Sequence, residues 1–157
     1  MKEYDIVTKV KEMDYAELSP EDANLVGMAA AMTDNSYAPY SRFRVGAAIL
    51  LSNGEIVTGA NQENVAYPSG TCAERSACFY AHARYPDAKF VKIAVAARGT
   101  NGEFTDNPTA PCGACRQALL EYETLAGTNV PVLLAGAKSV IEVESVKALL
   151  PLAFVEF

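Results

Sequence analysis

Three cysteines in two short segments have the spacing needed to hold a metal ion. Cys112 and Cys115 stand three positions apart, so on a helix they project from one face and can share one ion at a first turn. Cys72 opens another predicted helix, and the positive end of a helix dipole favours the thiolate that binds zinc. Three sulfur ligands leave a fourth tetrahedral position for water, which is typical of a catalytic zinc site. We therefore predict one Zn²⁺ per chain.

An acid and two arginines accompany these cysteines. Glu74 follows Cys72 by two residues, a spacing at which helical side chains diverge, so we expect an acid/base beside the metal and not a fourth ligand. Three thiolates overcompensate the charge of zinc and leave a formal charge of about -1. Arg75 and Arg116 each follow a cysteine segment closely, and we expect them to donate hydrogen bonds to thiolate sulfurs.

The remaining cysteine and the only histidine leave a second interpretation open. A Cys-x-x-Cys pair is often a redox pair or half of a structural zinc site, and Cys78 would supply a fourth sulfur. Six residues after Cys72 on one helix, however, Cys78 lies on roughly the opposite side and is expected in the core. His82 has no partner at ligand spacing and is expected to have a surface or packing role.

Helices and strands alternate around these segments. Ser19 and Pro20 are typical of a helix start, with the helix running to about Met32. Asn53-Gly54 favours a type I′ hairpin turn. The other helices are expected at 72–83, 112–122 and 145–150, and the strands at 44–51, 56–58, 90–97, 130–134 and 140–143. This order predicts an α/β fold, a three-layer α/β/α sandwich with a mixed five-stranded sheet.

Composition restricts the class of protein. At 157 residues and 50% hydrophobic, the chain is expected to bury one core, so we predict a single domain over 19–157 and an N-terminal extension over 1–18. A formal net charge of -6 argues against nucleic acid as a partner. No apolar run approaches the roughly 20 residues of a membrane helix, so we expect a soluble, cytoplasmic protein without a membrane partner.

Two motifs carry a family resemblance. Thr71-Cys-Ala-Glu-Arg-Ser-Ala77 and Pro111-Cys-Gly-Ala-Cys-Arg-Gln117 resemble the zinc signature of cytidine deaminases, in the version with three cysteines. Further segments resemble that family in the right order, namely 40–48, 59–64 and 149–154. The resemblance implies hydrolytic deamination of cytidine and deoxycytidine in pyrimidine salvage, with release of ammonia and with Glu74 transferring the protons.

The same resemblance implies contacts to a nucleoside substrate. Asn61 and Glu63 would hold the ribose hydroxyls, whereas on spacing alone they would satisfy backbone groups at a strand end. Phe43 would pack near the base, and Ala73 would contact the cytosine edge together with Glu74. Phe154 would stack on the base in a neighbouring subunit, since this form of the family is typically a homotetramer with shared active sites.

Three other functions remain as alternatives. One is a related zinc deaminase for another small cytosine compound, such as the antibiotic blasticidin S. Another is a non-catalytic zinc module in which four protein ligands saturate the metal. The third is a nucleic-acid editing enzyme, which the acidic charge and the lack of an aromatic and basic stripe oppose.

Overall fold

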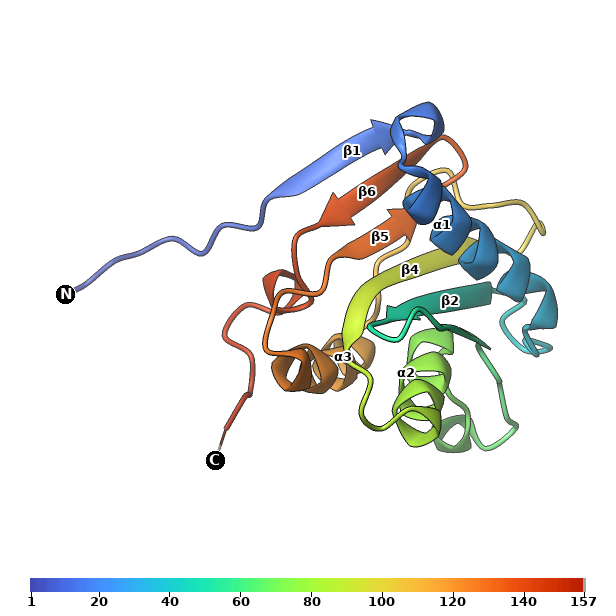
Figure 1. The fold of residues 1–157 in the computed structure, drawn as a ribbon. Coiled ribbons are helices and arrows are strands. Elements are labelled where there is room, and N and C mark those ends of the chain that lie inside the picture. Colours follow the sequence, from blue (N-terminus) through green and yellow to red (C-terminus); the bar gives the residue numbers. More distant parts are fainter. Residues whose placement is uncertain (157) are drawn as a thin grey trace.

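A mixed sheet of six strands forms the middle layer of the computed structural model, which describes residues 1–156 (Figure 1). The strand order is β1-β6-β5-β4-β2-β3, in which β4 and β5 are parallel and the other neighbours antiparallel. The strands are β1 (Val10–Asp14), β2 (Arg44–Leu51), β3 (Ile56–Ala60), β4 (Phe90–Arg98), β5 (Val132–Ala135) and β6 (Ser139–Val143). The parallel pair arises because a helix connects β4 to β5.

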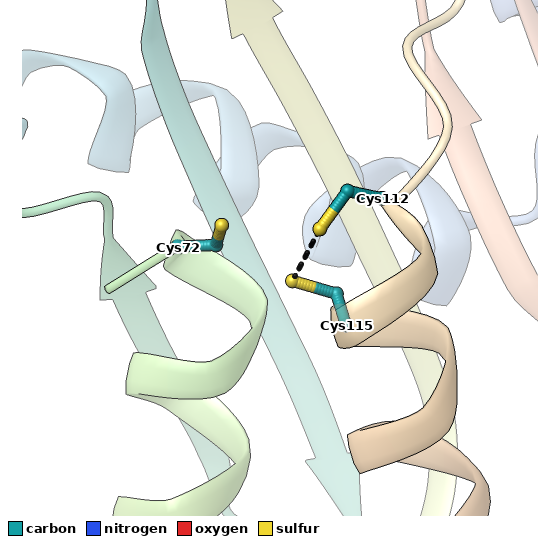
Figure 2. Close-up of side chains that lie close together, drawn as sticks. All are labelled: Cys72, Cys112 and Cys115. Atoms are coloured by element: carbon teal, nitrogen blue, oxygen red, sulfur yellow. Dashed lines mark hydrogen bonds between the residues drawn. The ribbon is translucent and has the colours of Figure 1, made fainter. Parts of the chain in front are cut away.

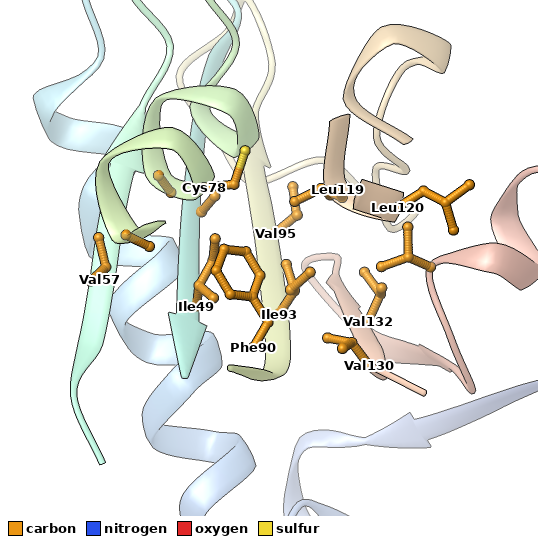
Figure 3. Packing of buried hydrophobic residues seen from close by; sticks show 14 of the residues in the cluster. Ile49, Val57, Cys78, Phe90, Ile93, Val95, Leu119, Leu120, Val130 and Val132 are labelled. Atoms are coloured by element: carbon orange, nitrogen blue, oxygen red, sulfur yellow. The ribbon is translucent and has the colours of Figure 1, made fainter. Parts of the chain in front are cut away.

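Helices cover both faces of the sheet (Figure 1). Helix α1 (Pro20–Met32) packs Leu25, Val26 and Ala29 against one face, and α2 (Ala73–Arg84) and α3 (Gly113–Ala126) pack on the other. The larger core lies under α2 and α3 and includes Ile49, Cys78, Phe90, Ile93, Val95, Leu119 and Val132 (Figure 3). The predicted three-layer α/β/α sandwich is confirmed. No helix among residues 1–156 combines the length and apolarity that crossing a membrane requires.

Elements with strong local signals lie where the sequence predicts them. The Ser19 Oγ accepts a hydrogen bond from Asp22 N at 3.1 Å, which caps α1. Strand β2 has the predicted bounds. Helix α3 runs four residues beyond the predicted end and stops at Gly127, whose φ of +71° suits a left-handed cap. The predicted helix at 145–150 is a single 3₁₀ turn, η4 (Lys147–Leu149).

The strand count corrects the prediction of five. Strand β1 pairs antiparallel with β6, from Val10↔Val143 to Asp14↔Ser139. The sequence Val-Lys-Glu-Met-Asp carries a weak strand signal, and its residues are mostly exposed. Its conformation depends on the edge of β6, which lies more than 120 residues away in sequence. The division of the chain into 1–18 and 19–157 stays a prediction.

The turn between β2 and β3 is also different from the prediction. Gly54 takes a φ of +84°, and its N–H donates to Leu51 O at 2.9 Å. A type I′ turn also needs a positive φ at Asn53. Among the described residues, the non-glycine positions with positive φ are Arg42 and Leu152, so the type I′ prediction is wrong. The hairpin itself is confirmed.

Two glycines let the helices approach the sheet closely. A Cβ at Gly59 of β3 would lie 2.7 Å from Ala73 O and 2.6 Å from Ala77 N, both in the backbone of α2. On the other face, a Cβ at Gly46 of β2 would lie 2.1 Å from Ala29 O of α1. Real Cβ atoms do not approach backbone atoms so closely. Gly59 therefore sets how near the first turn of α2 comes to the strand that leads into residues 61–63.

Candidate functional site

The three cysteines meet at the beginnings of α2 and α3 (Figure 2). Cys72 is the N-cap of α2, Cys112 is the N-cap of α3, and Cys115 lies in the first turn of α3. Their three sulfur atoms lie within 4.8 Å of one another, and the Sγ atoms of Cys112 and Cys115 are 3.5 Å apart. Two segments separated by about 40 residues thus form one sulfur cluster.

The cluster has the dimensions of a zinc site. Zinc binds sulfur at about 2.3 Å, so two sulfurs of one tetrahedral site stand about 3.8 Å apart. The observed separations are 3.5 Å between the Sγ atoms of Cys112 and Cys115 and at most 4.8 Å within the cluster. Small movements of the side chains would therefore bring all three sulfurs to the distances of one zinc site. Cys115 is buried whereas Cys112 is exposed, so the cluster opens toward solvent on one side. Within the described part of the chain, the metal-ligating cluster consists of these three cysteines, and together they fit one Zn²⁺ with a position open to solvent.

Hydrogen bonds among the sulfurs already favour a thiolate. The pKa of Cys72 is lowered to about 5, first because the Cys115 thiol donates to its sulfur and further because Arg75 does. The pKa of Cys115 is raised, because its proton is held in the bond to Cys72 and because the residue is buried. Cys72 is therefore the favoured position for a thiolate, and binding a cation would displace the remaining thiol protons.

Glu74 lies in the first turn of α2 and is only 4% exposed. Burial is the largest cause of its raised pKa, and the negative charge of Cys72 adds to it. The neighbouring Cys115 side chain acts in the opposite sense, and the influence of both cysteines on Glu74 places its carboxyl group beside the sulfurs. A carboxyl with a raised pKa is suited to take up and release protons near neutral pH.

The two arginines differ in what they contact. Arg75 Nη2 donates to Cys72 Sγ at 3.7 Å, as the sequence predicts. Arg116 does not follow that expectation, because its hydrogen bonds run to backbone oxygens, from Nε to Pro111 O at 2.7 Å and from Nη1 to Leu149 O at 2.6 Å. Arg116 therefore ties the residue before Cys112 to the C-terminal segment.

An open pocket of about 520 Å³ adjoins the metal cluster. Cys72 and Arg75 belong to its lining, and so do Asn61 and Glu63 at the end of β3. The structure thus brings the two predicted ribose contacts together with one predicted metal ligand. The volume lies in the range of small-molecule sites.

Asn61 and Glu63 also hold the pocket wall together. Asn61 Nδ2 donates to Phe43 O at 2.9 Å, and its Oδ1 accepts from Val45 N at 2.8 Å. Glu63 accepts from Tyr40 N at 2.8 Å and from the hydroxyl of Ser41. The bond from Ser41 is the first cause of the lowered pKa of Glu63.

The other predicted contact residues are distributed around this site. Ala73 is fully buried beside Cys72. Phe43 is half-buried and precedes β2, with its backbone bonded to Asn61. Phe154 lies on the C-terminal segment, where the residue is 66% exposed and its carbonyl accepts from Gln117 Nε2 at 2.9 Å. It does not belong to the pocket lining of its own chain.

The structure adds pocket residues that the sequence analysis did not single out. Tyr40, Ser41 and Tyr67 line the pocket, and the rings of Tyr40 and Tyr67 meet edge to face at 6.1 Å. Tyr40 and Ser41 lie in segment 40–48, which resembles the cytidine deaminase family, so that resemblance could have indicated a role for them at the site. Tyr67 carried no signal, since it lies in a polar loop.

Comparisons with known proteins agree with this geometry. Residues 19–127 match the family model for the cytidine and deoxycytidylate deaminase zinc-binding region. A cytidine deaminase of Halalkalibacterium halodurans is 40% identical, with 83% of this chain and 91% of that protein covered. One of Sporosarcina psychrophila is also 40% identical, with 83% and 88% covered.

A solved structure extends the likeness to the fold. The crystal structure of a cytidine deaminase from Burkholderia pseudomallei has a TM-score of 0.72 and 36% identity, and covers 87% of this chain and 100% of that one. Family model, relatives and fold all lead to the same group, as does the three-cysteine cluster beside a buried glutamate. The chain therefore belongs to the cytidine and deoxycytidylate deaminase family.

Proposed function

We propose that this protein is a hydrolase that deaminates cytidine and deoxycytidine to uridine and deoxyuridine, with one Zn²⁺ per chain, in pyrimidine salvage. The observation that carries the proposal is the cluster of three sulfurs within 4.8 Å, with the buried carboxyl group of Glu74 beside it and a nucleoside-sized pocket adjoining. Relatives named cytidine deaminase, 40% identical over most of the chain, support the choice of substrate.

In the proposed deamination, the cysteines hold the metal and Glu74 transfers the protons. A zinc ion held by the cysteines supplies a Lewis acid that lowers the pKa of water. Glu74 takes a proton from the attacking water and delivers it to N3 of the cytosine while the oxygen adds to C4. Glu74 then takes the proton of the new hydroxyl group at C4 and passes it to the amino group, the bond between C4 and that nitrogen breaks, and ammonia leaves as the C4 carbonyl forms.

Residues in and around the pocket next to the metal cluster hold the nucleoside. Asn61 and Glu63 bind the ribose hydroxyls, Phe43 packs near the base, and Ala73 contacts the cytosine edge. The deaminase domain spans 19–157, and 1–18 is an extension of it. The polar side chains of Asn61 and Glu63, which line the pocket together with Cys72, support this arrangement.

The proposal includes an assembly. Four copies form a homotetramer in the cytoplasm, and Phe154 of one copy stacks on the base in the site of another. Phe154 and the pocket residue Tyr67 are both exposed, which supports a contact between copies. Sedimentation of the zinc-loaded protein tests this part, and a monomer at micromolar concentration would contradict it.

The experiment measures zinc content and ammonia release on one sample. We expect one zinc per chain and ammonia from cytidine and deoxycytidine, followed also by the loss of ultraviolet absorbance of the base. Blasticidin S is the parallel substrate, and turnover of it with no turnover of cytidine would favour the related deaminase. A metal with four protein ligands and no ammonia would favour a structural zinc module.

A further inference from the structure

The hydroxyl of Ser41 connects two residues that the proposed function assigns to the nucleoside. Its Oγ donates to Glu63 Oε1 and accepts from Phe43 N at 3.0 Å. Glu63 belongs to the proposed ribose contact and Phe43 to the proposed base contact. One side chain thus reaches both halves of the substrate site from a single position on the pocket wall.

The backbone around Ser41 is shaped to make these bonds. Tyr40 N and Ser41 N both donate to Glu63 Oε2, at 2.8 and 3.2 Å. The next residue, Arg42, has a φ of +58°, an uncommon conformation for a residue other than glycine. This bend turns the chain so that Phe43 N returns to the Ser41 hydroxyl. The segment therefore wraps around the carboxylate of Glu63.

The hydroxyl proton and the backbone N–H of Ser41 are both donated within the protein. A hydroxyl has one proton to donate, and the proton of Ser41 goes to Glu63. A carboxylate offers about four acceptor positions, so Glu63 can still accept a hydrogen bond from a sugar hydroxyl. These two bonds give Ser41 a way to act on the substrate through Glu63 and Phe43.

We propose that Ser41 is a positioning residue that fixes the Glu63 carboxylate for the ribose and the Phe43 backbone for the base, an inference that rests on the proposed deaminase function. Without the hydroxyl, Glu63 loses one of its charge-assisted hydrogen bonds and samples more rotamers. Substrate binding must then order it again, which weakens binding and leaves the chemistry at C4 unchanged.

The first test compares Ser41→Ala with Ser41→Thr. We expect Ser41→Ala to raise KM for cytidine about tenfold with kcat within about twofold, the effect of losing one hydrogen bond to a charged group. Ser41→Thr keeps the hydroxyl and should stay within about threefold of the parent in KM. The exposed Ser69, replaced by Ala, is the matched control. A fall in kcat with KM unchanged, or a Thr variant as impaired as Ala, would overturn the proposal.

The second test asks whether Ser41 acts through Glu63. In a Glu63→Ala background, the cost of Ser41→Ala in kcat/KM should fall from about tenfold to about threefold or less, since of the two groups that Ser41 positions only the Phe43 backbone is left. With 2′,3′-dideoxycytidine, which lacks the 2′- and 3′-hydroxyls, the cost of Ser41→Ala should likewise shrink to about threefold or less. A full tenfold loss in either comparison would contradict a role through Glu63.

Binding measurements separate this proposal from the proposed function. Titration of the zinc-loaded variants with uridine, the product of the proposed reaction, gives Kd ratios that do not depend on turnover. If the parent releases no ammonia from cytidine, the deaminase assignment fails, yet the Kd ratio of Ser41→Ala to parent still tests positioning. Equal Kd values, or no nucleoside binding by any variant, would overturn the role of Ser41.

Discussion

Arg75 Nη2, in the first turn of α2, lies 3.7 Å from the Sγ of Cys72, the N-cap residue of that helix. The guanidinium offsets the charge that three thiolates add around a divalent ion, and it contributes to lowering the pKa of Cys72. Replacing Arg75 by Ala should therefore weaken zinc binding by about 10- to 100-fold, the usual cost of losing a partner of a metal ligand. Competition with a chromogenic chelator measures this, with Arg84→Ala at the exposed end of α2 as control. Unchanged zinc retention and turnover would contradict the role.

Glu74→Gln should keep zinc and lose turnover. The amide preserves the shape of the buried side chain but cannot take or give the protons that the proposed mechanism requires. We expect kcat to fall by about 10²- to 10⁴-fold, the typical contribution of a general acid/base. Zinc content and ammonia release on the same sample check both halves of the prediction. Near-normal turnover would remove Glu74 from the mechanism.

The cysteines should separate into two groups by zinc content. Alanine at Cys72, Cys112 or Cys115 removes one of three sulfurs and should cost most of the bound zinc. Cys78 is fully buried in the core, and burial raises its pKa to about 12, so Cys78→Ala should keep one zinc per chain. Loss of zinc on replacing Cys78 would favour the alternative interpretation, a structural zinc site with four sulfur ligands.

Gly59→Ala should disturb the metal site through the backbone. The added Cβ would lie 2.6 Å from Ala77 N and 2.7 Å from Ala73 O, so α2 must move away from β3. We expect a loss of about 1 to 3 kcal/mol in the free energy of unfolding, as for overpacked cores, together with weaker zinc binding. Gly27 of α1 has open space around it, and Gly27→Ala should raise stability by up to about 1 kcal/mol. Chemical denaturation of both variants measures the difference, and equal effects would contradict it.

Glu123 should be a major contributor to stability. Its buried carboxylate accepts hydrogen bonds from three backbone N–H groups, those of Val130, Val146 and Lys147, at 2.9, 2.7 and 3.0 Å. Glu123→Ala leaves these donors without an acceptor and should cost about 3 kcal/mol or more in the free energy of unfolding. Glu121→Ala, on the exposed side of the same helix, should cost little. Similar denaturation midpoints for the two variants would contradict this prediction.

The sequence predicts a feature well where the cause lies within a few residues. Ser19 and Pro20 determine the start of α1 because an N-cap needs only the next turn, and the bounds of β2 follow from a run of apolar and β-branched residues. The spacing of Cys112 and Cys115 predicts a shared face for the same reason. These local rules, with the family resemblance of the flanking motifs, were enough to predict the three layers and the metal-binding cysteines.

Tertiary structure decided what depends on distant partners. Residues 10–14 become a strand because β6 offers them a free edge, and Arg116 turns to Pro111 O and Leu149 O because the chain returns past it. The hydroxyl of Ser41 meets Glu63 only when the turn before β2 lies beside the end of β3. A hydrogen bond or a strand pairing needs two groups at a fixed distance, and folding alone brings together groups that are far apart in the sequence.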